Sequence, residues 1–233
     1  MYDHQLFLRT VSGFARLLLT SYDVDATVRE LSERTTEVFG LAGSGVSLMV
    51  EDRLVFETAV PSSLALLEMA QGESQEGPCV QACHSGEVVA VADLAGKTDG
   101  WEQYRAAAAD LGVRAVAGIP MSLGDRVVGA LNLYSSEPRE WSAEDLEGVQ
   151  VLADMCTGLL INGSELRQQE QLNEQLRLAL HSRVVIEQAK GMVANVHGES
   201  VEQAFERLRK RARDRNAPIR AVAEAVVELG LRL

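Results

Sequence analysis

The C-terminal part of the chain places apolar residues at the 3.6-residue period of amphipathic helices. After Gln175 these positions form three successive groups. The groups are Val185, Ile186, Ala189 and Val193, then Val201, Ala204, Phe205, Leu208 and Ala212, then Ile219, Val222, Ala223 and Val226. Each group predicts a short helix that is apolar on one side, so we expect a small three-helix bundle.

Helical patterns also occur in the first 162 residues. Residues 6–39 predict two helices, the second of which follows Tyr22-Asp23-Val24-Asp25, where an Asp can cap the helix start, and ends at Gly40. Further helical patterns lie at residues 62–71, near Cys79, at residues 101–111 and from Ser142 past Leu160.

Strand patterns separate these helices. Alternating apolar residues predict a hairpin over residues 43–61, with its turn at residues 51–53. A short strand is expected at residues 88–91, and Gly124-Asp125-Arg126 predicts the turn of a second hairpin over residues 114–134. Strands in this order, with helices at both ends, predict one α+β domain with an antiparallel sheet.

The segment after the first domain is polar and rich in Gln and Glu. A single long helix from Ser142 to about Asn195 is therefore possible, with a flaw at Gly163. One heptad frame predicts a weak coiled-coil seam and hence a homodimer, with Leu166, Asn173 and Leu180 at position a and Leu176 at position d. A solvated linker helix is the alternative reading of the same residues.

Charge is distributed unevenly along the chain, whose formal net charge is −12. Residues 1–162 hold 10 Lys and Arg against 24 Asp and Glu, whereas residues 163–233 hold 12 against 10. This asymmetry predicts domains with different partners. We expect one domain over residues 1–162, a helical linker over residues 163–175 and a second domain over residues 176–233.

The positive charge is concentrated in one predicted helix. Six of the nine residues from Arg207 to Arg215 are basic. A basic helix in an acidic protein is typical of a module that binds a polyanion. A salt-bridged, solvated helix face is the alternative, because Glu202, Glu206 and Asp214 lie nearby.

The predicted bundle resembles the ANTAR domain. The resemblance rests on I-E-Q-A-K-G at residues 186–191, A-F at 204–205, L-R at 208–209, Ala212, Asn216 and V-A at 222–223, and it covers about residues 176–229. ANTAR domains are small three-helix RNA-binding modules of bacterial regulators. They act by antitermination, in which binding of paired stem-loops in a leader transcript disfavours a terminator. The resemblance also implies dimers.

RNA is therefore the expected partner of the C-terminal domain. The candidate RNA-binding residues are Arg183, Gln188, Lys190, Gly191, Arg207, Arg209, Lys210, Arg211, Arg213 and Asn216. Two of them have a structural alternative. A glycine within a helix costs about 1 kcal/mol relative to alanine, so Gly191 suggests close approach of another helix or of a nucleic-acid backbone. Asn216 could instead cap the helix that starts at Pro218.

The first domain resembles the GAF domain over about residues 23–160. The matching strings are E-G-P-C at residues 76–79, G-E-V-V at 86–89, A-D-L at 92–94, G-I-P at 118–120 and G-D-R-V-V-G-A-L-N-L-Y at 124–134. GAF domains are small-molecule or signal sensors, and the resemblance implies a ligand between the sheet and the connecting segments. The candidate lining residues are Ser47, Cys79, Asp93, Trp101, Tyr104 and Asn132. Nothing in the sequence selects a cofactor, which stays unknown.

The chain has no strong enzyme signature. Walker and Rossmann glycine patterns and H-E-x-x-H are absent from the sequence. Cys79, Cys83 and His84 could form a metal or redox centre, but no second Cys and His pair accompanies them, so we predict no metal site. Buried free thiols in a reducing cytoplasm fit three cysteines and an N-terminus without the features of a signal peptide. No apolar run reaches the ~18 residues of a membrane span.

These observations lead to one hypothesis and three alternatives. We expect a cytoplasmic homodimeric regulator, not an enzyme, in which the GAF-like domain senses an unknown signal and the ANTAR-like domain binds RNA stem-loops. The alternatives are a transcription factor that binds duplex DNA, a GAF-type sulfoxide reductase using Cys79 or Cys83, and a dimerising adaptor without a ligand.

Overall fold

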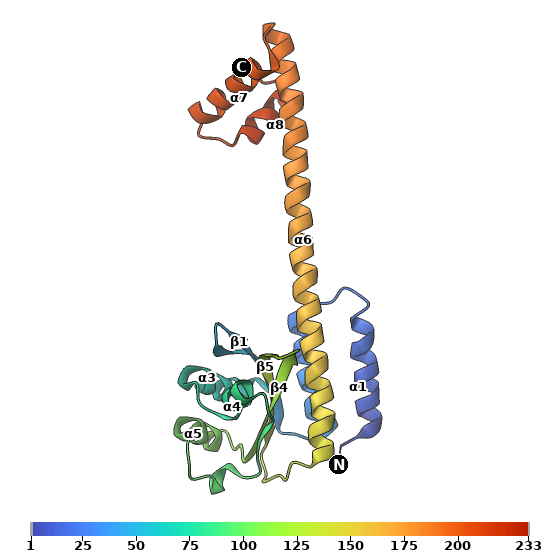
Figure 1. Cartoon of the computed structure of the whole chain (residues 1–233), viewed down its shortest axis with the longest axis vertical. Coiled ribbons are helices and arrows are strands. Elements are labelled where there is room, and N and C mark those ends of the chain that lie inside the picture. The colour runs from blue at the N-terminus through green and yellow to red at the C-terminus, as the bar shows by residue number, and fades with distance from the viewer. Residues whose placement is uncertain (1, 233) are drawn as a thin grey trace. The chain divides into compact units, whose positions relative to one another are not determined.

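The computed structural model describes residues 2–232 and divides into two compact units, Met1–Glu165 and Leu166–Leu233. Each unit has its own hydrophobic core, and Figure 1 labels the helices and strands of the chain. One helix, α6 (Ala143–His197), contributes residues to both cores. No helix among residues 2–232 combines the length and the apolar character needed to span a membrane.

The first unit is built on a five-stranded sheet in the order β2-β1-β5-β4-β3, in which each neighbouring pair is antiparallel. The strands are β1 (Gly43–Val50), β2 (Arg53–Val60), β3 (Val89–Val91), β4 (Ala115–Leu123) and β5 (Arg126–Ser135). Both predicted hairpins are present. Glu51 and Asp52 adopt left-handed φ values of 48° and 60°, as the tight turn between β1 and β2 requires.

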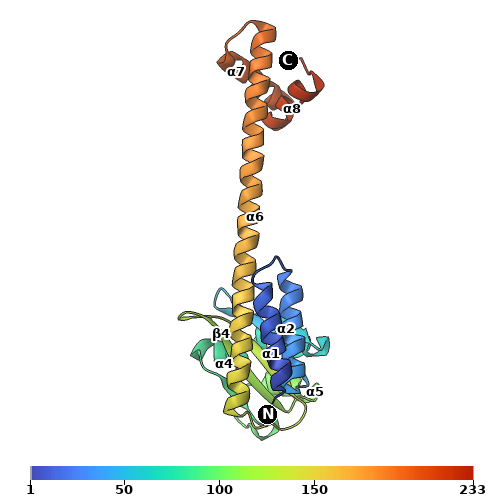
Figure 2. The same cartoon turned by 90° about the vertical axis from the view of Figure 1, so that its right-hand side faces the viewer.

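Helices cover both faces of this sheet (Figures 1 and 2). One face packs against α1 (His4–Leu17), α2 (Val24–Phe39) and the N-terminal part of α6. The other face carries the 3-10 helices η1 (Ser62–Leu64) and η2 (Leu94–Gly96) together with α3 (Ala65–Ser74), α4 (Pro78–Ser85) and α5 (Glu102–Asp110). The alternation of β5 explains this arrangement, because Leu131 and Leu133 enter the first core while Asn132 and Tyr134 point to the opposite face. The predicted α+β class is confirmed.

Local sequence signals set the ends of α2 as expected. The Asp23 carboxylate accepts a hydrogen bond from the Ala26 N–H at 2.8 Å, which satisfies a donor of the first turn. Gly40 ends the helix in the left-handed conformation, with φ 58°.

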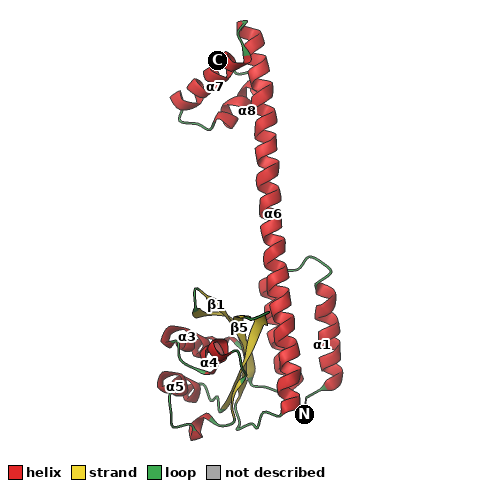
Figure 3. Ribbon diagram, viewed as in Figure 1, coloured by secondary structure: helices red, strands yellow, loops and turns green. Residues whose placement is uncertain are grey.

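The second unit contains a three-helix bundle, shown by the helix-coloured ribbon of Figure 3. Its helices are the C-terminal part of α6, α7 (Val201–Asp214) and α8 (Ile219–Leu229). The buried core residues are Val185, Ala189, Val193, Ala204, Leu208, Ala212, Val222, Ala223 and Val226. All nine belong to the three apolar groups of the sequence. A capping box between Ser200 and Gln203 begins α7.

The expectation of a flaw at Gly163 is wrong, since α6 continues through this residue. A Cβ atom on Gly163 would lie 2.1 Å from Cγ2 of Val24. Beside this contact, the Tyr22 hydroxyl donates a hydrogen bond to the Leu159 carbonyl of α6 at 2.7 Å. Glycine is therefore required here for close approach of the α2 N-terminus to α6, not for a break in the helix.

Gly163→Ala should lower the free energy of unfolding by about 1 kcal/mol or more, because overpacking outweighs the better helix propensity of alanine. Gly158→Ala is the matched control, since a Cβ at Gly158 of the same helix would meet nothing within 4 Å. The control should stabilise the protein by up to about 1 kcal/mol. Urea unfolding of both variants measures the difference, and equal effects would contradict the packing role of Gly163.

Candidate functional sites

Helix α7 positions the basic residues of the second unit. Ala204, Leu208 and Ala212 are buried along one side of the helix. The basic side chains that follow a different spacing must therefore lie towards solvent or at the edges of the bundle. The apolar side of α7 therefore packs in the bundle core, and its basic side chains are left for ion pairs or solvent.

Two of these cations are paired within the protein. Arg207 forms a bidentate ion pair with Glu199, with N–O distances of 3.0 and 2.8 Å, and this pair lowers the pKa of the Glu199 carboxyl. Arg209 pairs with Glu206 at 2.9 Å. The solvated, salt-bridged reading of the basic run is correct for these two arginines.

The other four cations of the run have no ion-pair partner in the described part of the chain. Lys210, Arg213 and Arg215 are exposed, and Arg211 is half-buried. Arg215 was not among the candidates from sequence, although it ends the same basic run. These four side chains carry the uncompensated positive charge of α7.

Lys190 of α6 lies close to α7. Its Nζ contacts both carboxylate oxygens of Glu187 at 2.9 Å and lies 5.3 Å from the centroid of the Phe205 ring. The Arg209 guanidinium is 5.7 Å from the same centroid. The half-buried Phe205 ring therefore brings cations of two helices together through cation–π contacts.

Gly191, Gln188 and Arg183 are exposed on α6. A Cβ on Gly191 would meet nothing within 4 Å, so tight packing inside the bundle does not explain this glycine. Asn216 is also exposed and adopts a left-handed φ of 47° in the turn after α7. The capping expectation for Asn216 is wrong, because Pro218 occupies the N-cap position of α8.

The first unit buries a polar cluster between its sheet and α3 and α4. The Glu68 carboxylate of α3 accepts hydrogen bonds from Asn132 Nδ2 at 2.6 Å to each oxygen, from the Tyr134 hydroxyl at 2.6 Å and from the Ser47 hydroxyl at 2.9 Å. The Cys79 thiol donates to Asn132 Oδ1. Burial raises the pKa of the Glu68 carboxyl, while these hydrogen bonds oppose the rise.

Three of the six predicted lining residues thus meet at Glu68, namely Ser47, Cys79 and Asn132. Tyr104 is buried nearby, and its hydroxyl has no hydrogen-bond partner among the described residues. The same is true of Nε2 of Gln71, whose Oε1 accepts the Cys79 N–H at 2.9 Å. The cluster therefore contains two buried donors that are not used within the protein.

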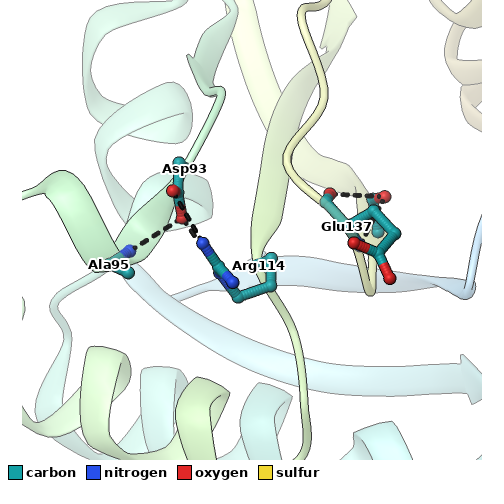
Figure 4. A network of polar contacts seen from close by, with 5 residues as sticks. Asp93, Ala95, Arg114 and Glu137 are labelled. Carbon is teal, nitrogen blue, oxygen red and sulfur yellow. Dashed lines mark hydrogen bonds and ion pairs between the residues drawn. The ribbon is translucent and has the colours of Figure 1, made fainter.

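Trp101 and Asp93 lie outside this cluster. Trp101 packs edge-on against Tyr104, with 6.2 Å between the ring centroids. The Lys97 ammonium lies over the Trp101 ring. Figure 4 shows Asp93 turned towards Arg114 and Ala95. Its carboxylate pairs with the Arg114 guanidinium at 2.8 and 3.0 Å and accepts the Ala95 N–H, which holds the pKa of Asp93 below its usual range.

Sequence reasoning missed Glu68, Gln71 and Tyr134. A signal was available, because Leu64, Leu67, Glu68 and Gln71 share one helical face and Leu67 is fully buried. A carboxylate and an amide on the apolar side of a short helix indicate a buried polar site. Tyr134 follows Asn132 by two residues on β5 and so faces the same side of the sheet.

The cysteines are buried free thiols. Burial raises the pKa of the Cys79 thiol well above its ordinary range and that of Cys83 to about 12. Such environments disfavour the thiolate, which is the reactive form of cysteine. No group of three or more His, Cys, Asp or Glu side chains in residues 2–232 is arranged to hold a metal ion.

Family comparisons match both units. Residues 23–160 match the GAF domain, and residues 174–227 match the ANTAR domain. A comparison with curated proteins gives no match.

Solved structures with the fold of the first unit include a free methionine-R-sulfoxide reductase from Neisseria meningitidis in complex with its substrate (18% identity, TM-score 0.53, covering 70% of this chain and 95% of that one). The reduced form of fRMsr of Staphylococcus aureus is similar at 14% identity and TM-score 0.52, covering 69% and 98%. The GAF domain from Acinetobacter phosphoenolpyruvate-protein phosphotransferase is similar at 13% identity and TM-score 0.51, covering 71% and 97%. At these identities the likeness concerns the fold alone.

The combination of a GAF domain and an ANTAR domain in one chain supports a regulatory protein. The chain belongs to the GAF domain family and carries an ANTAR domain, the RNA-binding antiterminator domain, in its C-terminal part.

Glu68→Gln tests the buried carboxyl. Its pKa is raised above the ordinary 4.5, so its contribution to stability is complete below pH 4.5 and is lost as pH rises through the raised folded-state pKa. The stability of Glu68→Gln relative to wild type should therefore increase from pH 4.5 to pH 8, as measured by urea unfolding.

Glu68→Ala is the control for this experiment. It should destabilise the protein at each of these pH values, because loss of the acceptor leaves buried donors unsatisfied at about 1–3 kcal/mol each. A pH-independent difference between Glu68→Gln and wild type would contradict the raised pKa.

Proposed function

We propose that this protein is a cytoplasmic RNA-binding antitermination regulator, in which the GAF domain responds to a small-molecule signal and a dimeric ANTAR domain binds paired stem-loops of a leader transcript. The observation that carries the proposal is the set of four cations on or beside α7 that have no acidic partner, within an ANTAR domain. The electrostatics of the two units supports it, since the acidic first domain repels a polyanion.

The unpaired and paired cations have different roles in this proposal. Lys210 and Arg213 are free to contact phosphate without breaking an internal ion pair. Arg207 and Arg209 must exchange Glu199 and Glu206 for RNA, and so contribute less net affinity. Lys190 extends the surface from α6, with Arg183, Gln188 and Gly191 on the exposed part of that helix.

Dimerisation is supported by the apolar residues of α6 between the two cores. The three leucines of the predicted seam, Leu166, Leu176 and Leu180, are 38%, 53% and 64% exposed. An isolated helix in water gains little stability from propensity alone, and burial of this seam against a second copy supplies the missing packing. When one of two linked ANTAR domains binds a stem-loop, the other is held at a high effective concentration near the second stem-loop of the same transcript, which raises the overall affinity.

Signal transmission follows from the same helix. A ligand that prefers one arrangement of the GAF dimer shifts the equilibrium between two registers of the paired α6 helices. The register in turn changes the spacing of the two RNA-binding surfaces. The buried donors of Tyr104 and Gln71 and the Glu68 carboxylate are the groups that we assign to ligand recognition.

The protein acts as a regulator rather than as an enzyme in this proposal. The raised thiol pKa values of Cys79 and Cys83 oppose the nucleophilic chemistry that a reductase needs. The structural likeness to reductases concerns the backbone of the GAF fold.

Binding to a two-hairpin RNA, a single hairpin and a DNA duplex of matched length, across a salt series, tests RNA recognition. Wild type should prefer the two-hairpin RNA. Lys210→Gln with Arg213→Gln should lower affinity at least about tenfold and reduce the slope of log K against log salt by about 1.4, for two lost phosphate contacts.

Arg53→Gln with Arg126→Gln is the charge-matched control, because both arginines are exposed at the first residues of β2 and β5 in the first unit. It should leave affinity and slope unchanged. Preference of the wild type for duplex DNA would replace the proposal by a DNA-binding function, and equal losses in both double variants would remove the specific role of α7.

Leu176→Glu with Leu180→Glu tests the seam by sedimentation equilibrium. The variant should be monomeric where wild type is dimeric, and it should lose affinity for the two-hairpin RNA more than for the single hairpin. Leu178→Glu is the control, because this exposed leucine is about 200° around the helix from both seam positions. A dimer that persists in the double variant would place the interface elsewhere.

A further inference from the structure

A surface groove of about 360 Å³ lies in the second unit between α7 and the region of α8. Arg211 of α7 and Arg215 at the C-cap of that helix line it, and Ala221, Val222, Ala225 and Leu231 are among its apolar lining residues. The volume is within the range of about 300–1,000 Å³ that is usual for small-molecule pockets. The groove belongs to a single unit and is formed without a second copy.

The apolar side of this groove is formed mainly by small side chains. Ala221 and Ala225 are four residues apart on α8 and so share one face of that helix, and Ala217 lines the groove from the turn before it. Methyl groups at successive turns leave a shallow apolar strip on which a flat ring can lie. Larger side chains at these positions would fill the groove.

The charged side of the groove consists of two uncompensated guanidinium groups. Arg211 and Arg215 are also four residues apart, and neither forms an ion pair with a described residue. On α8, Arg220 pairs with Glu224 at 2.7 Å, and no acidic residue is among the lining residues of the groove. The groove therefore combines a flat apolar surface with two cations that are free to bind an anion.

We infer that this groove receives one unstacked base of an RNA loop, while Arg211 and Arg215 hold the adjoining phosphate or stack on the base. A nucleotide has the matching chemistry, because its base is a flat ring with an apolar face and its phosphate is anionic. Guanidinium groups both stack on unpaired bases and bind phosphate bidentately. A base that remains paired in a duplex cannot enter.

This inference rests on the proposed RNA-binding function and makes it more specific. The outward cations Lys210 and Arg213 contact any phosphate backbone, whereas the groove distinguishes an open loop from a continuous helix. The inference also assigns Arg215 to phosphate binding or base stacking, which the salt-bridged arginines Arg207 and Arg209 do not perform in the groove.

The test uses the full chain with hairpin RNAs that carry 2-aminopurine at one loop position at a time. One position should show a fluorescence change on binding, because its base leaves the stack and enters the groove. Removal of that base, as an abasic nucleotide, should weaken wild-type binding about tenfold.

Ala221→Leu fills the groove and keeps both arginines, and Ala221 is exposed, so the fold should tolerate the change. This variant should bind the unmodified hairpin about tenfold more weakly than wild type, but it should lose nothing further with the abasic hairpin. Ala106→Leu, at an exposed alanine of α5, is the control and should behave as wild type.

Wild-type affinity of Ala221→Leu for the unmodified hairpin would overturn the base-binding role of the groove, while the proposed RNA binding would stand. An abasic penalty equal in wild type and Ala221→Leu would likewise overturn it. Absence of wild-type binding to every hairpin would overturn the proposed function, and the groove with it.

Discussion

One helix has to satisfy two hydrophobic cores. Near its N-terminal end α6 contributes Val149, Leu152 and Leu159 to the first unit, and near its C-terminal end it contributes Val185, Ala189 and Val193 to the second. The residues between these two groups are held by helical backbone hydrogen bonds without a core of their own. Each domain therefore packs against one end of α6. The residues of α6 between the two cores depend on helix propensity and on burial of their exposed leucines in the proposed dimer.

The second constraint is the crowding of like charge on α7. Six cations in nine residues repel one another, and the helix tolerates them because its apolar side is buried and because Glu199 and Glu206 neutralise two of them. This division leaves the cations without an acidic partner as the ones that the proposed RNA binding uses. The acidic first unit would repel a polyanion, which agrees with the placement of the proposed contact on the second unit.

Much of the fold could be predicted from the sequence because its signals are local. The two hairpin turns, the Asp23 cap and the three apolar groups each require only neighbouring residues. The errors arose where a tertiary contact or a competing local rule decided the outcome. The need for glycine at position 163 comes from contact with Val24, which is distant in sequence. The N-cap position of α8 is occupied by Pro218, whose fixed φ already suits a helix start.

The candidate sites were less predictable for the same reason. The basic run indicated which helix to consider, but only the fold separates Arg207, which faces Glu199, from Lys210 and Arg213, which face solvent. The Glu68 cluster joins α3, α4, β1 and β5, so no single segment contains it. Ser47, Cys79 and Asn132 could be selected through family resemblance, whereas the carboxylate that unites them could not.

The continuity of α6 has a consequence for the evolution of this architecture. Each residue inserted into or deleted from an α-helix turns everything beyond it by about 100°, whereas a change of seven residues leaves a phase error of only about 20°. Natural variation in the length of residues 166–184 should therefore be quantised, with insertions and deletions of whole heptads accepted and single-residue changes rejected. The length of this segment thus sets the rotational phase between the core residues at the two ends of α6.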